Sequence, residues 1–333
     1  MAMERRALGR TGLQVSVLGF GCGDVGGLMP RGAPADRERA VARALELGIN
    51  YFDTAPSYGD GLSERHLGET LRALGATPFV GTKVRLGPAD LGDMRGAVAR
   101  SLEQSLQRLG LPRVDLLQLH NPIATARQDG RLAAADVLGD VVDGLEALRR
   151  AGKTRFYGIT AVGETPALHG VVGSGRIDTA QVPHNLLNPS AGRLLPPRFP
   201  AQDFSGLLDQ CRAHGVGAIA IRVLAGGALS GTSARHPLGT PRVSPIATGS
   251  DYEADVARAR RLQPLIVEGH ATSLIEAALR FAISHEGVST VLVGYSSLEQ
   301  LETAAAAVAR GPLPAAALDR LRAVWGGVGE ARR

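Results

Sequence analysis

Short apolar runs alternate with longer amphipathic stretches along almost the whole chain. Runs of four to seven residues between Gly, Pro or polar clusters predict buried strands, and apolar residues three or four positions apart predict helices. The strands are predicted at residues 17–21, 50–53, 79–84, 114–119, 154–160, 179–183, 217–223 and 288–293. The helices are predicted near residues 36–48, 62–74, 94–109, 135–151, 164–172, 202–214, 252–267 and 272–285, with a last one from about Leu298.

Strands and helices in regular alternation predict right-handed βαβ units and a parallel sheet. Eight strands close a (β/α)8 TIM barrel, and residues 8–16 ahead of them have the pattern of a β-hairpin with its turn at 9–12. Neither a linker nor a change of composition interrupts the series, so we expect a single domain over residues 1–333. A doubly wound open sheet is the alternative, but no GxGxxG motif follows the first strand.

The composition is that of a globular protein that buries a full core, with 44% hydrophobic and 21% charged residues among 333. No apolar run approaches the roughly 18 residues of a membrane span. The charged N-terminus leads to no apolar signal core, and we therefore expect a cytoplasmic protein. Two distant cysteines, Cys22 and Cys211, and histidines without ligand spacing predict neither a disulfide framework nor a metal site.

The net charge of +5 raises the question of a nucleic-acid partner. The arginines are scattered among acidic residues and aromatic residues make up only 4%, so we expect no nucleic-acid binding. A basic pocket for an anionic cofactor accounts for the excess equally well. Lysine is rare, with Lys83 and Lys153 the only two in the chain, which suggests a specific need for a compact ammonium group.

Four ionisable residues follow three consecutive predicted strands. Asp53 ends the second strand, Tyr58 lies five residues later in a Pro/Gly loop, Lys83 is near the end of the third, and His120 follows the fourth. The carboxyl ends of barrel strands meet at one rim, where catalytic groups collect. Each residue alone has a structural explanation. Asp53 would cap the next helix or form a salt bridge with Lys83, Tyr58 would be a half-exposed loop aromatic, and His120 would be a satisfied buried side chain. Together they favour a catalytic site.

These side chains suit proton donation to a carbonyl oxygen. A phenol has a pKa of about 10 and is a poor acid at neutral pH, but a nearby ammonium favours the phenolate. An aspartate beside the lysine keeps the ammonium charged and in place. A neutral imidazole can donate a hydrogen bond to the carbonyl, so the set serves carbonyl reduction by hydride.

The pattern resembles the aldo-keto reductase family nearly from end to end. Residues 52–59, Phe-Asp-Thr-Ala-Pro-Ser-Tyr-Gly, are a very specific match to its catalytic segment. Residues 6–16 resemble its opening hairpin, and residues 81–83 and 119–122 match its lysine and histidine segments. The resemblance implies a barrel that binds NAD(P)H extended, without a Rossmann fold. It also implies a catalytic tetrad in which Tyr58 is the general acid, Lys83 paired with Asp53 tunes it, and His120 orients the carbonyl.

The cofactor segments match less completely. Where the family holds the carboxamide with a Ser-Asn pair, Thr160 keeps the hydroxyl but Ala161 replaces the amide. Ile221 stands where an aromatic residue usually stacks on the nicotinamide. The cofactor-binding residues that the resemblance implies are Gly21, Asp53, Thr160, Gln181, Arg222, Leu224, Gly226, Gly294, Ser296 and Gln300.

These segments leave the choice of cofactor open. Arg222 would reach the pyrophosphate, and main-chain N–H groups at 294–297 would suit a phosphate. NADPH is the expected cofactor. NADH is possible, because Gly294 and Gln300 stand where NADPH-dependent members often carry basic residues, and Thr303-Ala304 replaces a Glu-Asn pair at the adenine.

Substrate selectivity is expected from the loops after strands one, four and seven and from the C-terminal tail. The candidate lining residues are Asp24, Val25, Met29, Arg85 and Asn121. Arg85 would meet an anionic substrate, or else is a solvated surface residue. The longest connection, 224–250, predicts a functional lid or binding loop, with surface disorder as the alternative.

We therefore expect an NAD(P)H-dependent oxidoreductase that reduces a small-molecule aldehyde or ketone to an alcohol, or runs in reverse as an alcohol or sugar dehydrogenase. One alternative is a redox-sensing, cofactor-loaded binding module resembling the potassium-channel β subunits. Another is a Schiff-base lyase that uses Lys83. The sequence leaves the substrate and the oligomeric state open.

Overall fold

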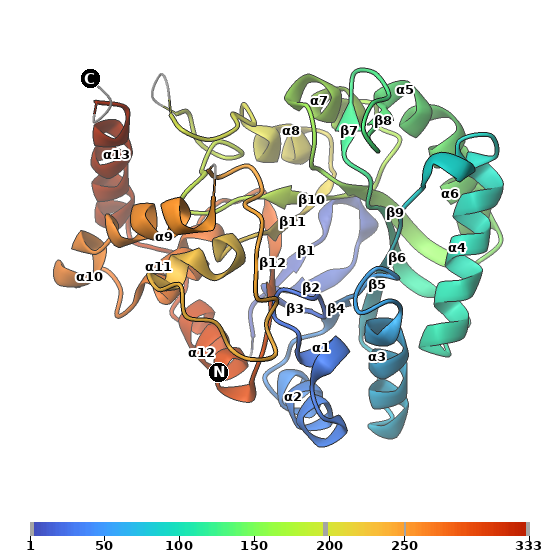
Figure 1. Ribbon diagram of the computed structural model, residues 1–333, viewed down its shortest axis with the longest axis horizontal. Coiled ribbons are helices and arrows are strands. Elements are labelled where there is room, and N and C mark those ends of the chain that lie inside the picture. The colour runs from blue at the N-terminus through green and yellow to red at the C-terminus, as the bar shows by residue number, and fades with distance from the viewer. Residues whose placement is uncertain (1–2, 196–198, 250, 331–333) are drawn as a thin grey trace.

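Eight parallel strands form a closed barrel at the centre of the computed structural model, which describes residues 3–195, 199–249 and 251–330 (Figure 1). The barrel strands are β3 (Leu18–Gly21), β4 (Tyr51–Asp53), β5 (Phe79–Val84), β6 (Val114–Leu119), β9 (Thr154–Thr160), β10 (Thr179–Pro183), β11 (Gly217–Ile221) and β12 (Val288–Gly294). Pairing of β12 with β3 and of β9 with β10 closes the ring. The predicted (β/α)8 barrel is confirmed, and the open sheet is excluded.

The register of β3 to β6 sets the heights of the strand ends. Asp53 on β4 lies level with Gly21 of β3 and with Gly81 of β5. Side chains alternate along a strand, so Gly81 and Lys83 face the same side, with Lys83 two residues nearer the carboxyl end. Lys83 therefore extends from the rim just above Asp53.

The predicted hairpin closes the opposite end of the barrel. Its strands are β1 (Arg5–Ala7) and β2 (Gln14–Ser16), which pair antiparallel. Leu8, Leu13 and Val15 are buried and pack in one cluster with barrel residues. Gly9 has φ of +51°, and a Cβ there would lie 2.3 Å from the Gly217 nitrogen, so this close approach requires glycine.

Helices surround the barrel, and those at the C-terminal end of the chain gather on one side, at the left in Figure 1. The helices that follow barrel strands are α2 (Pro34–Glu46), α3 (Leu62–Ala73), α4 (Met94–Leu109), α6 (Val142–Arg150), α7 (Thr165–Gly173), α8 (Leu207–Ala213), α11 (Leu274–Ala282) and α12 (Leu298–Ala309). The remaining helices are α1 (Leu28–Arg31), α5 (Ala134–Asp136), α9 (Tyr252–Arg260), α10 (Pro264–Val267) and α13 (Ala315–Glu330).

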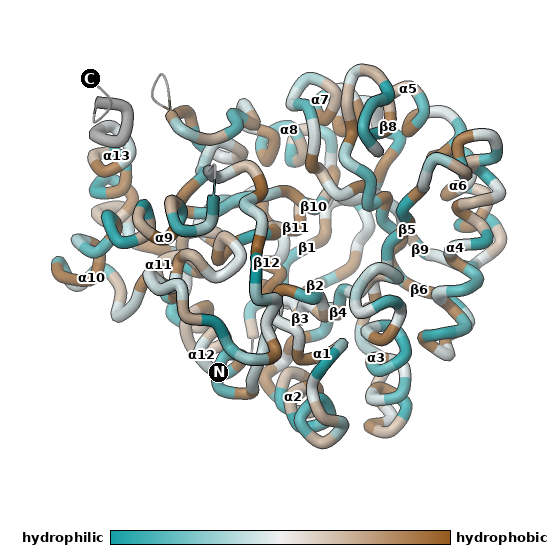
Figure 2. The backbone as a smooth tube through the Cα atoms, in the orientation of Figure 1, coloured by the Kyte–Doolittle hydropathy of each residue, from teal (hydrophilic) through white to brown (hydrophobic). Residues whose placement is uncertain are grey.

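Helix α4 illustrates why these segments are helical. Asp93 caps its start by accepting a hydrogen bond from the Gly96 nitrogen at 2.9 Å, and Gly110 ends it with φ of +63°. Val98 and Leu102, four residues apart, are fully buried against the barrel. Figure 2 shows the resulting alternation of hydrophobic and hydrophilic positions along the helices.

Several predicted boundaries are wrong for local reasons. The helix predicted at 202–214 begins only at Leu207, after Gly206 with φ of +73°. The helix predicted at 135–151 is interrupted by a π-helical turn, Val137–Val141, in which Gly139 leaves the helical conformation. The helix predicted at 252–267 is two helices, the second beginning at Pro264. The strand predicted at 217–223 ends at Ile221, because Arg222 has φ of +56°.

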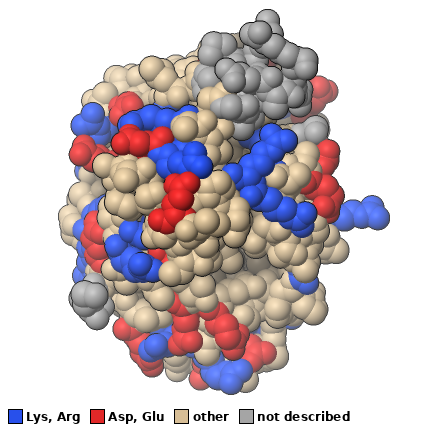
Figure 3. Space-filling model, turned by 90° about the vertical axis from the view of Figure 1, so that its left-hand side faces the viewer, with Lys and Arg blue, Asp and Glu red and all other residues tan. Residues whose placement is uncertain are grey.

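Two further features bear on the expected partners. On the face shown in Figure 3, basic and acidic side chains are interspersed instead of forming a surface of one sign. Within the part of the chain that the structure describes, no helix is both long enough and apolar enough to cross a membrane.

Candidate active site

A buried ion pair joins the ends of β4 and β5. Lys83 Nζ donates to Asp53 Oδ1 and, at 2.9 Å, to the Thr54 carbonyl, and both charged side chains are 1% exposed. The second carboxylate oxygen, Asp53 Oδ2, accepts from the Tyr51 hydroxyl at 2.8 Å and from Gln181 Nε2 at 2.6 Å. The Asp53 carboxylate therefore has three donors on its two oxygens.

This pairing keeps the ammonium charged. Burial is the largest single influence on the pKa of Lys83 and lowers it, but Asp53 and Tyr58 together outweigh burial and leave the pKa above its ordinary value. Breaking such a pair by removing one partner leaves an uncompensated buried charge and costs about 3–5 kcal/mol. The arrangement is a fixed, permanently charged ammonium at the barrel rim.

Tyr58 lies over this ammonium, with its ring centroid 4.9 Å from Lys83 Nζ. Gly59 and Gly61, with φ of +58° and +83°, shape the loop, and the Gly59 nitrogen donates to Asp24 Oδ1 at 3.1 Å. Burial raises the pKa of Tyr58 and Lys83 lowers it, and the net pKa is above its ordinary value. The lysine thus acts in the expected direction, but the phenol stays protonated because burial is the larger influence.

His120 completes the group at the end of β6. Its nitrogen continues the strand ladder to the Val84 carbonyl at 2.7 Å, and its ring meets the Tyr58 ring edge-on with centroids 6.0 Å apart. Burial lowers the pKa of His120 to about 3, and the charges of Lys83 and Arg85 act in the same direction. The imidazole is therefore neutral at neutral pH and keeps one N–H to donate. The structure brings together all four residues that the sequence singled out.

Beside the tetrad, the ends of β9 and β10 carry groups suited to an amide ligand. The Thr160 hydroxyl is buried and has no hydrogen-bond partner among the residues that the structure describes, and Gln181 lies beside Thr160 on the adjacent strand. Ala161 is fully buried. An orphaned buried hydroxyl next to a buried amide fits the carboxamide of a nicotinamide cofactor.

The chain after β11 has a backbone suited to an anion. Arg222, Ala225, Gly226 and Gly227 all have positive φ, two of them without being glycine. Strained backbone of this kind clusters at ligand sites. The half-buried Arg222 guanidinium donates to the Ser244 carbonyl at 3.4 Å and, within the described residues, pairs with no carboxylate.

Polar groups in the segment between β12 and α12 form hydrogen bonds within the protein that the sequence did not indicate. The Ser296 nitrogen donates to Gln300 Oε1 at 2.8 Å, and the Ser296 hydroxyl donates to the Gly26 carbonyl at 2.5 Å. One main-chain N–H predicted for a phosphate thus already has a partner within the segment. Gly294 is exposed, and Gly21 is needed for strand contact, because a Cβ there would lie 2.9 Å from the Val293 carbonyl oxygen.

The substrate candidates differ in their surroundings. Asn121 is buried, and its amide both donates to the Leu86 carbonyl and accepts from the Leu86 nitrogen at 2.8 Å, so this side chain clamps the loop after β5. Arg85 is exposed and, among the described residues, makes no hydrogen bond or ion pair. Val25 is half-buried, and its carbonyl accepts from the Thr240 nitrogen at 3.3 Å. Their contact with a substrate stays a prediction.

Sequence reasoning missed Tyr51, which holds the carboxylate of Asp53. The signal was present, because residues two apart on a strand face the same side, so Tyr51 and Asp53 share one face of β4. A tyrosine in an apolar run is interpreted as a core residue as long as the partner of its hydroxyl is unknown.

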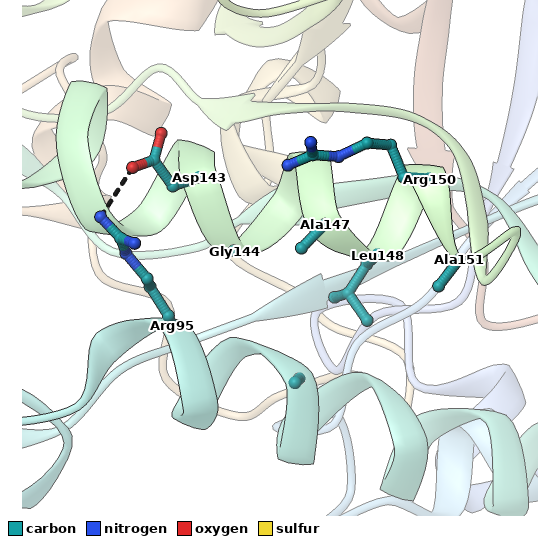
Figure 4. Close-up of a pocket in the computed structure, with 8 residues that line it drawn as sticks. Arg95, Asp143, Gly144, Ala147, Leu148, Arg150 and Ala151 are labelled. Carbon is teal, nitrogen blue, oxygen red and sulfur yellow. Dashed lines mark hydrogen bonds and ion pairs between the residues drawn. The ribbon is translucent and has the colours of Figure 1, made fainter.

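A groove on the outer helical layer lies apart from these groups. Its volume is about 560 Å³, and it runs between α4 and α6. Figure 4 shows Arg95 of α4 joined to Asp143, with Gly144 and Ala147 further along α6, and the ion pair measures 2.7 Å. None of its lining residues belongs to the tetrad.

The comparisons with known proteins agree with this geometry. The model of the Aldo/keto reductase family matches residues 17–326. The chain is 32% identical to L-galactose dehydrogenase of Arabidopsis thaliana over 92% of this chain and 88% of that protein. It is 31% identical to pyridoxal 4-dehydrogenase of Microbacterium luteolum over 90% and 91% of the two chains. The holo form of aldo-keto reductase AKR11C1 from Bacillus halodurans superposes with a TM-score of 0.72 at 26% identity, covering 97% of this chain and 96% of that one.

The closed barrel and the match to the family model over most of the chain show that the protein is an oxidoreductase. The chain belongs to the aldo/keto reductase family, whose members act on small-molecule carbonyl substrates with nicotinamide cofactors.

Proposed function

We propose that this protein is an NAD(P)H-dependent reductase of aldehydes or ketones that also catalyses the reverse oxidation of an alcohol. The observation that carries the proposal is the buried Asp53–Lys83 pair beneath Tyr58, with a neutral His120 beside it. A protonated phenol next to a fixed ammonium is suited to giving up its proton and stabilising the phenolate that remains.

In the reducing direction, Tyr58 gives its hydroxyl proton to the carbonyl oxygen of the substrate. The Lys83 ammonium stabilises the tyrosinate, and Asp53 holds the ammonium in place. His120 donates its N–H to the carbonyl oxygen and orients it. The proton on oxygen and the hydride on carbon together make the alcohol, and Tyr58 recovers its proton from solvent.

The nicotinamide cofactor, when bound, supplies the hydride to the carbonyl carbon. Thr160 and Gln181 would hold its carboxamide, and residues 222–227 and 294–300 would hold its phosphates. We propose NADPH as the cofactor. NADH is the alternative, because Gly294 and Gln300 carry no charge that could bind a 2′-phosphate.

The substrate remains to be found among carbonyl compounds and the corresponding alcohols. Two relatives are named dehydrogenases, of L-galactose and of pyridoxal, which supports screening the oxidation of sugars and aromatic substrates as well as reduction. A Schiff-base role for Lys83 needs a neutral, accessible amine. The burial of Lys83 and its bonds to Asp53 and Thr54 speak against that role.

Calorimetric titration with NADPH and NADH, followed by a screen of aldehydes, ketones, alcohols and sugars for cofactor absorbance at 340 nm, tests the proposal. We expect tight binding of one nucleotide and turnover that depends on Tyr58. Nucleotide binding with no turnover of any substrate would contradict the reductase. Tight retention of the cofactor with very slow turnover would instead favour a redox-sensing, cofactor-loaded binding module.

A further inference from the structure

Tyr51 is a second tyrosine of the site, beneath the tetrad and out of reach of any substrate. It is fully buried on β4 and its hydroxyl donates to Asp53 Oδ2 at 2.8 Å. The opposite oxygen of the carboxylate is the one that binds Lys83. Two donors on Oδ2, Tyr51 and Gln181, thus leave Oδ1 directed at the lysine.

The barrel makes room for this contact with glycine on a neighbouring strand. A Cβ at Gly81 would lie 2.7 Å from the Tyr51 hydroxyl oxygen and 3.3 Å from Asp53 Oδ2. A Cβ at Gly19, on the other side, would lie 3.2 Å from the Tyr51 ring. The phenol is therefore held in one place by steric fit, with its hydroxyl on the carboxylate.

We propose that Tyr51 is a positioning residue that acts through Asp53 and Lys83 to set the acidity of Tyr58. The inference rests on the proposed function, since it concerns the proton that Tyr58 donates. The Tyr51 hydroxyl donates to Asp53 Oδ2 and Lys83 Nζ donates to Asp53 Oδ1, and the Tyr58 ring centroid lies 4.9 Å from this ammonium.

The sign of the effect follows from where the charges lie. The Tyr51 O–H dipole points its positive end at Asp53 and disperses part of the carboxylate charge. Without this dipole, the potential around Asp53 is more negative. A negative potential disfavours a phenolate, so the pKa of Tyr58 rises and Tyr58 becomes a weaker acid.

The Tyr51 phenol itself stays protonated throughout the working range of pH. Burial raises its pKa well above the ordinary value, and the Asp53 carboxylate adds to the rise. Other ionisable groups around the pair come from several elements and are the same in wild type and variant. They are Cys22 after β3, Tyr58 after β4, Lys83 and Arg85 of β5 and its loop, His120 after β6 and Arg222 after β11.

The test compares Tyr51→Phe with Tyr157→Phe over the pH range of carbonyl reduction. Tyr157 is also buried on a barrel strand, but its ring lies under Arg149 of α6, 4.9 Å away, on the outside of the barrel. In Tyr51→Phe we expect kcat to fall about three- to tenfold, a change of the size that one ordinary hydrogen bond makes. The alkaline limb of the kcat profile should move up by about half a pH unit or more, with cofactor affinity unchanged.

A second readout needs no turnover. The chain has only two lysines, so ¹⁵Nζ labelling gives one signal for Lys83 and one for Lys153, which pairs with Glu103 at the surface. We expect the Lys83 signal of Tyr51→Phe to shift at neutral pH, while the Lys153 signal stays in place. Circular dichroism and thermal unfolding are used to check that both variants fold.

The outcomes separate the two proposals. If wild type reduces carbonyls and Tyr58→Phe does not, yet the pH profile and the Lys83 signal of Tyr51→Phe coincide with those of wild type, the positioning role of Tyr51 is wrong. An alkaline limb that moves down would also contradict it. If wild type turns over no carbonyl or alcohol, the proposed function fails, and if Tyr58→Phe keeps full activity, another group donates the proton. In both cases the Lys83 signal still reports whether Tyr51 acts on the ion pair.

Discussion

At the scale of single residues, the chemistry of this protein depends on which oxygen meets which donor. The Asp53 carboxylate divides its two oxygens between Lys83 on one side and Tyr51 with Gln181 on the other. Burial and the Asp53 charge raise the pKa of Tyr58 and Lys83 lowers it, so changes at Asp53 reach the phenol both directly and through the lysine. Variants that remove these contacts therefore test the roles of the tetrad residues.

Replacing Tyr58 with phenylalanine removes the proposed acid and leaves the ring in place. We expect kcat of carbonyl reduction to fall at least about a hundredfold, as is typical when a general acid is lost. Cofactor affinity, measured by calorimetry, should be unchanged. Tyr157→Phe serves as the matched control with near wild-type activity, and an active Tyr58→Phe would show that another group donates the proton.

Replacing Lys83 with methionine removes the ammonium but keeps the length of the side chain. Because Lys83 lowers the pKa of Tyr58, we expect lower turnover and an alkaline limb at higher pH. Lys153→Met, at the surface, should behave as wild type. The buried Asp53 charge left alone costs about 3–5 kcal/mol, so Asp53→Asn/Lys83→Met, which removes both charges, is made in parallel. A pH profile unchanged in the folded variant would rule out the tuning role.

At the scale of elements, the long connection after β11 is tied across the rim of the barrel. Arg31 Nε donates to the Leu238 carbonyl at 2.8 Å and its guanidinium pairs with Asp24 at 3.0 Å. The Thr240 hydroxyl donates to the Asp24 carbonyl at 2.7 Å, and Arg235 Nε donates to the Thr240 carbonyl at 2.6 Å. The segment predicted as a lid at 224–250 therefore has defined contacts, and only its last residue lies outside the described residues.

Cutting one of these ties tests whether the connection acts as a lid. In Arg31→Met we expect faster proteolytic cleavage within residues 232–248 and faster dissociation of the cofactor, because the hydrogen bond from Arg31 to the Leu238 carbonyl is lost. Limited proteolysis with and without NADPH, and stopped-flow release, measure the two rates. Arg39→Met, which loses only an exposed pair with Asp36 on α2, is the control. Equal rates in both variants would contradict a lid.

At the scale of the whole molecule, two buried histidines make the stability of the fold depend on pH. Burial lowers the pKa of His120 and of His184 to about 3 each, and for His184 the charges of His285 and Arg193 act in the same direction. The unfolded chain binds protons at these residues below a pH of about 6.5, whereas the folded chain does not. Their contribution to stability is thus present above pH 6.5 and is lost as the pH falls toward 3.

His184→Asn tests this coupling away from the tetrad. We expect the free energy of unfolding of wild type to fall between pH 7 and pH 5 by about 2 kcal/mol for each such histidine. The variant should lose one histidine's share of that slope, whatever its stability at pH 7. Denaturant titrations at both pH values measure the slopes, with His214→Asn at an exposed site as the control. Equal slopes in His184→Asn and wild type would show that the folded protein takes up the His184 proton over the same pH range as the unfolded chain.

The sequence by itself determined the eight barrel strands and the positions of Asp53, Tyr58, Lys83 and His120. These features are local. A short apolar run predicts a strand, and the polar residue after the run marks the carboxyl end of that strand. The rule that parallel strand ends meet at one rim then joins distant residues without any coordinates.

Only the tertiary structure decided which partner each polar group takes. The sequence did not indicate that Tyr51 binds Asp53, that Asn121 binds Leu86 or that the Ser296 nitrogen donates to Gln300. The net direction of the Tyr58 pKa also needed the fold, because burial and the nearby ammonium oppose each other. Register, closure of the barrel and burial are properties of contacts between distant segments, and no local pattern records them.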